Sequence, residues 1–203
     1  MILKSKDVFF EYSWVPSLNW SPDSPTLVYF LGYDSKIPRK PTRKWKWNML
    51  YISDSSGMGQ KGSWFFGTGG SPDILLSIES FLLEMALSGV LSKSSLFFSG
   101  KGMGGHAALY FHALLGGRGC YCHNPTSNLV NSDYSNNKHK EIFSSIFSSK
   151  KTHEYQFLPD FLSRSELKGE ILISHSESGI FFNEHILPLE SLVSVRISEK
   201  NNF

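Results

Sequence analysis

A glycine-rich turn between a predicted strand and a predicted helix carries the clearest chemical pattern in this sequence. It reads FFSGKGMGGHAAL from position 97 onward. A nucleophile elbow has the form G-x-S-x-G directly after a strand, because the turn leaves no room for side chains beside the nucleophile. Gly100 and Gly104 match the flanking glycines, and Gly102 stands where the serine would be. Glycine cannot attack a carbonyl, so we predict a vacant nucleophile position and no ordinary serine-hydrolase chemistry.

The same turn also fits the dinucleotide-binding pattern G-x-G-x-x-G, read as Gly100, Gly102 and Gly105. Two features argue against that interpretation. The turn lies near the middle of the chain rather than after its first strand, and no acidic residue follows about 20 residues later, where the pattern needs one to bind the ribose. A nucleotide-binding module stays open as an alternative.

Apolar runs and turn signals predict the elements that position this turn. A helix is expected with Ser71 as N-cap, Pro72 at its first position, Asp73 in its first turn and a stop near Gly89. A second helix, Met103–Leu115, opens directly from the glycine turn. After it we expect an irregular stretch from Asn124 to Lys140 and a helix near Ile142–Phe147. The predicted strands, the first of them a strand or hairpin, are Asp7–Val15, Thr26–Leu31, Trp47–Ser53, Ser95–Ser99, Gly119–His123, Glu170–Ser174 and Leu192–Ile197.

Alternation of strands and helices predicts the fold class α/β, with a doubly wound, mostly parallel sheet. The 203 residues suffice for one substantial core, and no linker divides them, so we expect one domain over residues 1–203. Ligands of such sheets bind at the carboxyl ends of the strands, which is where the glycine turn lies.

The stretch Leu27–Leu129 resembles the α/β-hydrolase-like proteins of capsular polysaccharide biosynthesis and of the accessory Sec system, which exports serine-rich glycoproteins. The resemblance rests on four pieces: the strand ending at Gly32, Asp54 with GSWFFG at Gly62–Gly67, the run SGKGMGGHAALYF, and Asn124-Pro125. It implies an α/β-hydrolase-like fold in which the elbow serine has been replaced by glycine.

The resemblance also implies where the other site residues lie. In the family pattern the catalytic acid follows the next-to-last strand, where Glu177 could fill the position, and a histidine follows the last strand. Here that last segment, Ser198–Phe203, contains no histidine. An oxyanion hole made of backbone N–H groups could survive at Met103 and at Gly32 or Tyr33.

Three further side chains are candidates for contact with a ligand. Lys101 could place a positive charge beside an anionic group, or point to solvent. His106, in the first helical turn, could contact a ligand or pack in the interior. His185 could approach the end of the sheet if its segment folds back, but a surface position on a helix is favoured. The tryptophans that would suit sugar stacking, although core packing is favoured for them, are Trp45, Trp47 and Trp64.

Composition excludes several classes of protein. Hydrophobic residues make up 40% and charged residues 19%, and the formal net charge is only +2, which predicts a globular chain without a nucleic-acid surface. The basic stretch Pro38–Lys46 is expected to be a solvated loop. Neither a signal peptide nor a membrane span is recognised, so we expect a soluble cytoplasmic protein. Cys120 and Cys122 are predicted to be reduced core thiols; with His123 they lack the further ligands of a zinc site, so we expect no metal and no cofactor.

These observations lead to a first hypothesis of a noncatalytic binding or scaffolding protein in bacterial surface polysaccharide or glycoprotein production. Its expected partners are a glycan or acyl ligand and a protein of the glycan or secretion machinery. The second hypothesis is a carbohydrate esterase or acyl-transferring enzyme whose elbow serine has been replaced, by engineering or with bypass through another nucleophile such as Ser99.

Overall fold

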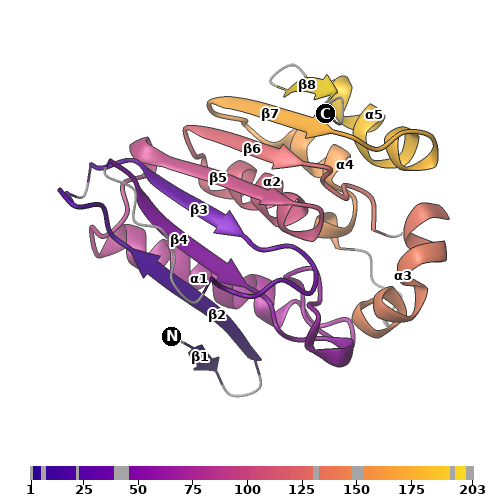
Figure 1. Ribbon diagram of the computed structural model, residues 1–203, viewed down its shortest axis with the longest axis horizontal. Coiled ribbons are helices and arrows are strands. Elements are labelled where there is room, and N and C mark those ends of the chain that lie inside the picture. Colours follow the sequence, from indigo (N-terminus) through magenta and orange to yellow (C-terminus); the bar gives the residue numbers. More distant parts are fainter. Residues whose placement is uncertain are drawn as a thin grey trace.

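One β-sheet contains the strands of the described part of the chain, which comprises residues 2–5, 8–21, 23–38, 46–129, 133–147, 153–192 and 195–199 of a computed structural model. The strands lie in the order β1-β2-β4-β3-β5-β6-β7-β8 (Figure 1). The pairs β1–β2 and β2–β4 are antiparallel, and all other neighbouring pairs are parallel. The bounds are β1 Ile2–Ser5, β2 Val8–Val15, β3 Thr26–Phe30, β4 Asn48–Ser53, β5 Leu96–Lys101, β6 Gly119–His123, β7 Glu170–His175 and β8 Val195–Glu199.

Helices and short helical turns connect the later strands. Their bounds are α1 Asp73–Leu87, α2 Met103–Leu115, α3 Asp133–Ile146, α4 Leu158–Arg164 and α5 Leu187–Glu190, with a π-helical turn at Phe182–Ile186 and single 3₁₀ turns at Met58–Gln60, Lys93–Ser95 and Glu154–Gln156. Among the described residues, no helix combines the length and apolar composition that a membrane span requires.

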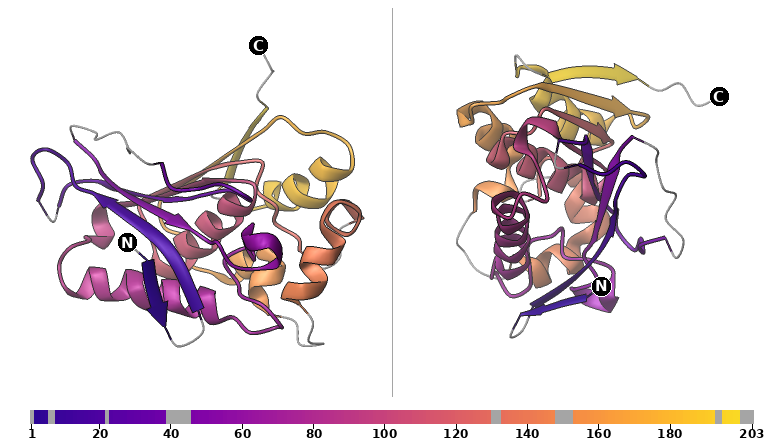
Figure 2. Two further views of the ribbon diagram at one scale, coloured as in Figure 1. Left: turned by 60° about the horizontal axis from the view of Figure 1, so that its bottom comes forward. Right: turned by 90° about the vertical axis from the view of Figure 1, so that its left-hand side faces the viewer.

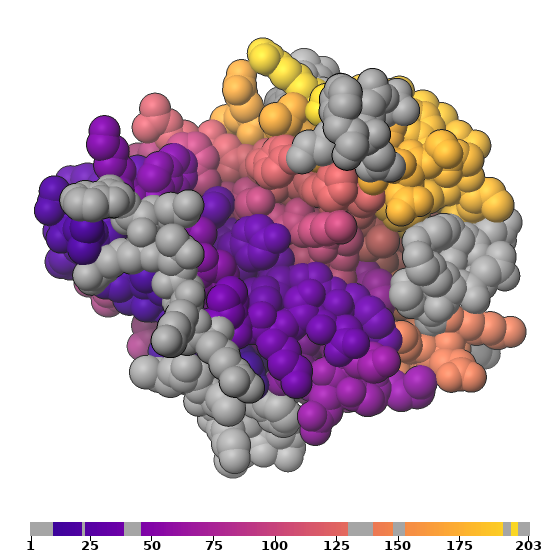
Figure 3. All heavy atoms as spheres, in the orientation of Figure 1, coloured from indigo at the N-terminus to yellow at the C-terminus, as the bar shows by residue number. Residues whose placement is uncertain are grey.

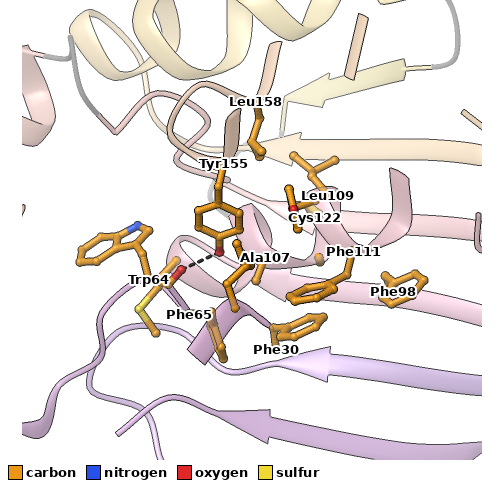
Figure 4. Packing of buried hydrophobic residues seen from close by; sticks show 14 of the residues in the cluster. Phe30, Trp64, Phe65, Phe98, Ala107, Leu109, Phe111, Cys122, Tyr155 and Leu158 are labelled. Carbon is orange, nitrogen blue, oxygen red and sulfur yellow. Dashed lines mark hydrogen bonds between the residues drawn. The ribbon is translucent and has the colours of Figure 1, made fainter. Parts of the chain in front are cut away.

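The core lies between one face of the sheet and helices α1, α2 and α4 (Figures 1 and 2). Strand residues alternate between faces, so the side chains that point toward these helices come from every second position. Phe111 of α2 stacks on Phe30 of β3 with ring centroids 5.1 Å apart (Figure 4). On this face the strands contribute Val28, Phe30, Leu50, Ile52, Phe98, Cys120, Cys122, Ile171 and Ile173.

The opposite face of the sheet has no helix packed on it among the described residues. The connection from β3 to β4 would be the place for one, and its described parts, residues 31–38 and 46–47, contain none. Residues 39–45, which include Trp45 and most of the predicted basic loop, lie outside the described residues. The sheet is therefore covered by helices on one side only, as far as the structure describes the chain, so the second helix layer of the predicted doubly wound sheet is not seen among the described residues.

The predicted elements are largely confirmed. Met103–Leu115 and Gly119–His123 coincide with α2 and β6. The predicted first segment, Asp7–Val15, forms the single strand β2, and its hairpin partner β1 lies before it in the chain. The last strand is displaced toward the C-terminus, since β8 begins at Val195 and Leu192 lies before it.

The N-terminus of α1 differs from the prediction. Pro72 rather than Ser71 is the N-cap, and no side chain caps the helix. The carbonyl of Phe66 accepts hydrogen bonds from the amides of Ile74 and Leu75 instead, at 3.2 Å each. A distant backbone group thus satisfies the first-turn donors that a capping serine would otherwise bind.

The predicted irregular stretch from Asn124 to Lys140 is wrong in its second half, because α3 begins at Asp133. Ile142, Phe143 and Ile146 are buried and anchor the last turns of this helix. Once anchored, a helix extends at little cost, because each added residue gains a hydrogen bond, so the preceding segment needs no apolar periodicity of its own.

Candidate functional site

The glycine turn joins β5 to α2 with a single residue, Gly102, between Lys101 and Met103. Gly102 has φ 55° and ψ −116°, a left-handed conformation that glycine adopts without strain. The flanking glycines are required by contact: a Cβ on Gly100 would lie 2.2 Å from the carbonyl oxygen of Gly104, and one on Gly104 would lie 2.1 Å from that of Phe30. The turn therefore has the tightness that defines a nucleophile elbow.

Gly102 itself is not crowded. A Cβ built there would meet no atom within 4 Å, and the residue lines a pocket of about 630 Å³. The position from which an elbow nucleophile would project is thus open space above the turn.

This pocket lies at the carboxyl ends of the parallel strands. Its lining residues come from the ends of β3, β5, β6 and β7 and from two loops: Tyr29, Leu31, Gly32, Tyr33, Ser35, Trp64, Lys101, Gly102, Met103, Asn124, Thr126, Glu177 and Phe181. All the predicted site residues except His106 are among them. Neither histidine nor cysteine occurs among these described lining residues.

Charged and polar groups are distributed unevenly around the pocket. Lys101 and Glu177 are exposed, whereas Met103 is buried at the start of α2. The amide of a residue in the first turn has no acceptor within its own helix and points toward the helix N-terminus, where the helix dipole favours negative charge. A polarised carbonyl or carboxylate oxygen in the pocket would therefore meet both the α2 N-terminus and the Lys101 side chain.

His106 does not reach the pocket. Its ring is fully buried, with Nδ1 facing the carbonyl oxygen of Thr126 and Nε2 lying 2.8 Å from that of Tyr155. Burial lowers the pKa of His106 to about 4, against the two carbonyl oxygens, which favour the protonated ring; a neutral ring can donate to only one of them. Of the two predicted roles, the geometry corresponds to interior packing: a ligand contact would require this ring to leave both carbonyls.

Trp64 forms part of the pocket wall and is held rigidly. It is only 1% exposed, its Nε1 donates a hydrogen bond to Thr126 Oγ1 at 2.9 Å, and its carbonyl oxygen accepts one from the Tyr155 hydroxyl at 2.6 Å (Figure 4). Trp64 and Phe65 adopt positive φ angles of 54° and 57°, which are strained for such side chains. Trp64 packs in the interior, as was predicted in preference to sugar stacking. Trp47 packs on Phe97, with ring centroids 5.0 Å apart.

The carboxylate of Asp54 holds this strained loop in place. It accepts five hydrogen bonds, from the amides of Ser56, Ser63 and Phe65 and from the hydroxyls of Ser56 and Ser63. The sequence singled out Asp54 only through a family resemblance. Its anchoring role could not be read from spacing, because the donors are turn residues whose directions depend on the loop conformation.

The segment after β7 brings its residues to the pocket in an unexpected way. Glu177 lines the pocket, and its carbonyl oxygen lies 3.2 Å from Nδ1 of His175. His185 was expected at the surface, and this expectation is wrong: it is fully buried, and its Nδ1 accepts a hydrogen bond from the amide of Asn128 at 3.2 Å. The helical turns after β7 fold back over the loop that follows β6, which encloses this ring and lowers the pKa of His185 to about 4 by burial.

Comparisons of the sequence with protein-family models and with curated proteins find no match. Solved structures do match. The capsule O-acetyltransferase of Neisseria meningitidis serogroup A superposes with a TM-score of 0.70 at 14% identity, covering 99% of this chain and 86% of that one. An S-formylglutathione hydrolase from Agrobacterium tumefaciens gives 0.72 at 11% identity, over 98% and 84%. The chain has the α/β-hydrolase fold.

A third match to this α/β-hydrolase fold is the Glycosylation Associate Protein (Gap123) complex from Streptococcus agalactiae, with a TM-score of 0.69 and 16% identity. The match covers 96% of this chain and 40% of that one, so the chain spans less than half of this relative. The predicted α/β, mostly parallel, hydrolase-like sheet and the resemblance to capsule and accessory Sec proteins are confirmed at the level of the fold.

The α/β-hydrolase fold also bears on the nucleotide-binding alternative. In dinucleotide-binding folds the glycine turn follows the first strand, in the strand order 3-2-1-4-5-6. Here it follows β5 in a sheet that begins with an antiparallel hairpin. Among the described residues, no group of three or more histidine, cysteine, aspartate and glutamate side chains is placed to hold a metal ion.

Proposed function

We propose that this chain is a noncatalytic α/β-hydrolase-fold protein that binds a glycan, or an acyl group carried by one, in the pocket above Gly102. It would act as a binding or scaffolding component, together with a protein partner, in the production of bacterial surface polysaccharide or glycoprotein. The single observation that carries the proposal is the open pocket over an elbow whose tip has no side chain.

The chemistry of the pocket wall supports binding over turnover. Acyl transfer at an elbow needs a nucleophile and a base that removes its proton. The described lining offers two aliphatic hydroxyls, those of Ser35 and Thr126, besides the phenolic hydroxyls of Tyr29 and Tyr33, but no histidine to activate any of them. Ser35 Oγ donates to the carbonyl oxygen of Tyr33 at 3.4 Å, and Thr126 Oγ1 accepts from Trp64. Ser99, the alternative nucleophile, does not line the pocket.

The biological process is supported by what the similar structures do. Two of them are a capsule O-acetyltransferase and a glycosylation-associated protein complex. Both concern carbohydrate at the bacterial surface or on protein. A pocket that combines aromatic walls, an amide, several hydroxyls and one charge of each sign suits a ligand of this chemistry.

A carbohydrate esterase or acyltransferase whose serine has been replaced is the second candidate. It is favoured by one observation: the elbow retains the geometry that presents a nucleophile, and a side chain at position 102 would project into open space.

Esterase and labelling assays separate the two candidates. Hydrolysis of 4-nitrophenyl acetate and labelling by a fluorophosphonate, read out by intact mass, are measured for the wild-type chain and for Gly102→Ser. We expect the wild-type chain to show neither turnover nor label. Labelling of Gly102→Ser alone would support the replaced-serine candidate, and turnover by the wild-type chain would overturn the noncatalytic proposal.

Binding is tested by filling the pocket. Gly102→Phe adds a ring above the elbow, and Gly102→Ala is its matched control, because both impose the same left-handed strain and only one fills space. Oligosaccharides selected on a glycan array are titrated against each variant by calorimetry. We expect Gly102→Phe to weaken binding at least about tenfold relative to Gly102→Ala. Equal affinity of the two variants would place the ligand elsewhere.

A further inference from the structure

The helix-free face of the sheet carries a row of five residues beside the pocket, and three of them are tyrosines. In register across neighbouring strands, Tyr51 pairs with Tyr29, Tyr29 with Ser99, Ser99 with Tyr121, and Tyr121 with Leu172. We call these five residues the tyrosine row. With strands about 4.8 Å apart, the row extends for about 19 Å across the sheet. Figure 3 shows this face, with the pink segments of β5 and β6 at the surface in its middle.

The two faces of the same strands differ in chemistry. Toward the helices, these strands present aliphatic, cysteine and phenylalanine side chains that are almost fully buried. Toward the helix-free side, the tyrosine row is followed at the carboxyl end of the strands by polar residues that include Lys101, His123 and Ser174. A parallel-sheet face made for a helix layer is normally a run of valine, isoleucine and leucine. The tyrosine row instead combines aromatic surface with hydroxyl groups.

Part of the row is exposed and held in a fixed conformation. Tyr121 is 38% and Leu172 42% exposed, and the Tyr121 hydroxyl shares a hydrogen bond with Ser174 Oγ at 2.9 Å. Tyr29 packs edge-on against Tyr51 with centroids 6.1 Å apart. Rings fixed in this way lose little entropy when a ligand stacks on them.

The row is also continuous with the pocket. Tyr29 belongs to both, and Lys101, which lines the pocket, lies two residues after Ser99 on the same face of β5. A ligand that emerges from the pocket over β3 and β5 would therefore pass directly onto the tyrosines. Pyranose rings have apolar faces that stack on aromatic rings and edges that carry hydroxyl groups, which matches the amphipathic tyrosine side chains of this surface; Ser99 between them is buried.

From these observations we infer that the tyrosine row is a second binding surface, which holds the units of a glycan chain that extend beyond the pocket. The inference rests on the proposed function and makes the ligand an oligosaccharide of several units rather than a small acyl compound.

Chain length tests this inference. The array-selected glycan is prepared as a monosaccharide and as oligomers of two to six units, and each is titrated calorimetrically against the wild-type chain, Tyr121→Ala and Tyr121→Phe. We expect affinity to rise with length, and Tyr121→Ala to weaken binding of the longest oligomers about fivefold to tenfold while leaving the monosaccharide unchanged. Tyr121→Phe keeps the ring and should retain most of the affinity.

A matched control is Trp20→Ala, which removes another exposed aromatic side chain, 48% exposed, from the turn before β3 at the amino-end edge of the sheet. It should not change binding of any oligomer. Thermal unfolding of each variant verifies that it is folded.

Several outcomes overturn the inference. If Gly102→Phe weakens binding but Tyr121→Ala affects all lengths equally or none, the row is no subsite and the proposed function survives alone. If neither substitution matters, both proposals fail. Sedimentation analysis tests whether a second copy of this chain binds the tyrosine row instead. If the wild-type chain is a dimer and Tyr121→Ala is a monomer, the row is a dimer interface and glycan binding there is overturned.

Discussion

Three glycines of the elbow have different physical reasons for being glycine. At Gly100 and Gly104 a side chain does not fit, because a Cβ would lie about 2 Å from a backbone oxygen. A Cβ at Gly102 would meet no atom within 4 Å, so only the positive φ of 55° disfavours a side chain at this position. The absence of a side chain at Gly102 therefore affects the chemistry of the site, whereas glycine at positions 100 and 104 is required by the fold.

Alanine substitutions separate these reasons. Gly104→Ala forces a Cβ against the Phe30 carbonyl oxygen, and we expect a loss of about 3 kcal/mol or more in the free energy of unfolding. Gly102→Ala carries only backbone strain and should lose about 1 kcal/mol. Urea unfolding followed by circular dichroism measures both. A larger loss for Gly102→Ala than for Gly104→Ala would contradict the elbow geometry.

At the scale of elements, the pocket depends on loops that strands and helices hold by polar contacts. The loop after β4 is bound to Asp54, and through Trp64 and Thr126 it is joined to the loop after β6. That second loop is joined in turn to the segment after β7, because the Asn124 side chain bonds both the amide and the hydroxyl of Ser176. The loop after β4, the loop after β6 and the segment after β7 thus hold one another in place around the pocket.

Asp54→Asn tests the first of these links. The asparagine amide keeps one acceptor oxygen but places a donor group against amides and hydroxyls that themselves donate, so we expect a loss of about 2–4 kcal/mol in unfolding free energy. The strained Trp64–Phe65 turn should relax, which increases Trp64 fluorescence quenching by acrylamide. Glu79→Gln on α1 is a matched control that removes one carboxylate elsewhere. Unchanged quenching in Asp54→Asn would show that the turn is held by packing alone.

At the scale of the whole molecule, buried histidines link stability to pH. Burial lowers the pKa values of His106, His112 and His185 to about 4. An unfolded histidine titrates near 6.5, so between pH 6.5 and 4 the unfolded chain binds more protons than the folded one. The stabilisation from these neutral rings is therefore complete above pH 6.5 and is lost as pH falls toward 4.

His112→Leu isolates one of these contributions. Neither ring nitrogen of His112, which is buried on α2, makes a hydrogen bond of good geometry, and the backbone of Lys168 is a polar group that acts on the ring. Replacement by leucine therefore removes a titrating group and loses at most this one weak contact. Both chains should lose unfolding free energy when the pH is lowered from 7 to 5, and we expect the variant to lose about 2 kcal/mol less than the wild-type chain. Urea unfolding at the two pH values measures this difference. An identical pH dependence in both chains would show that His112 does not titrate on unfolding.

The sequence by itself was enough to predict the elements and the elbow, because their signals are local. An apolar run such as Thr26–Leu31 indicates a buried strand, and the contacts that exclude side chains at Gly100 and Gly104 arise within one tight connection. The bounds of α2 and β6 follow from the same short-range constraints.

Only the tertiary structure decided which further side chains join the predicted residues in the pocket and which histidines are enclosed away from it. His106 and His185 have the sequence context of ligand or surface histidines, yet both are enclosed by loops from distant parts of the chain. The anchoring of Trp64 by Thr126 and the helix-free face with its tyrosine row likewise depend on segments tens of residues apart. Such contacts form because burial and hydrogen bonding are satisfied over the whole molecule at once, and a local pattern does not record where its distant partners will lie.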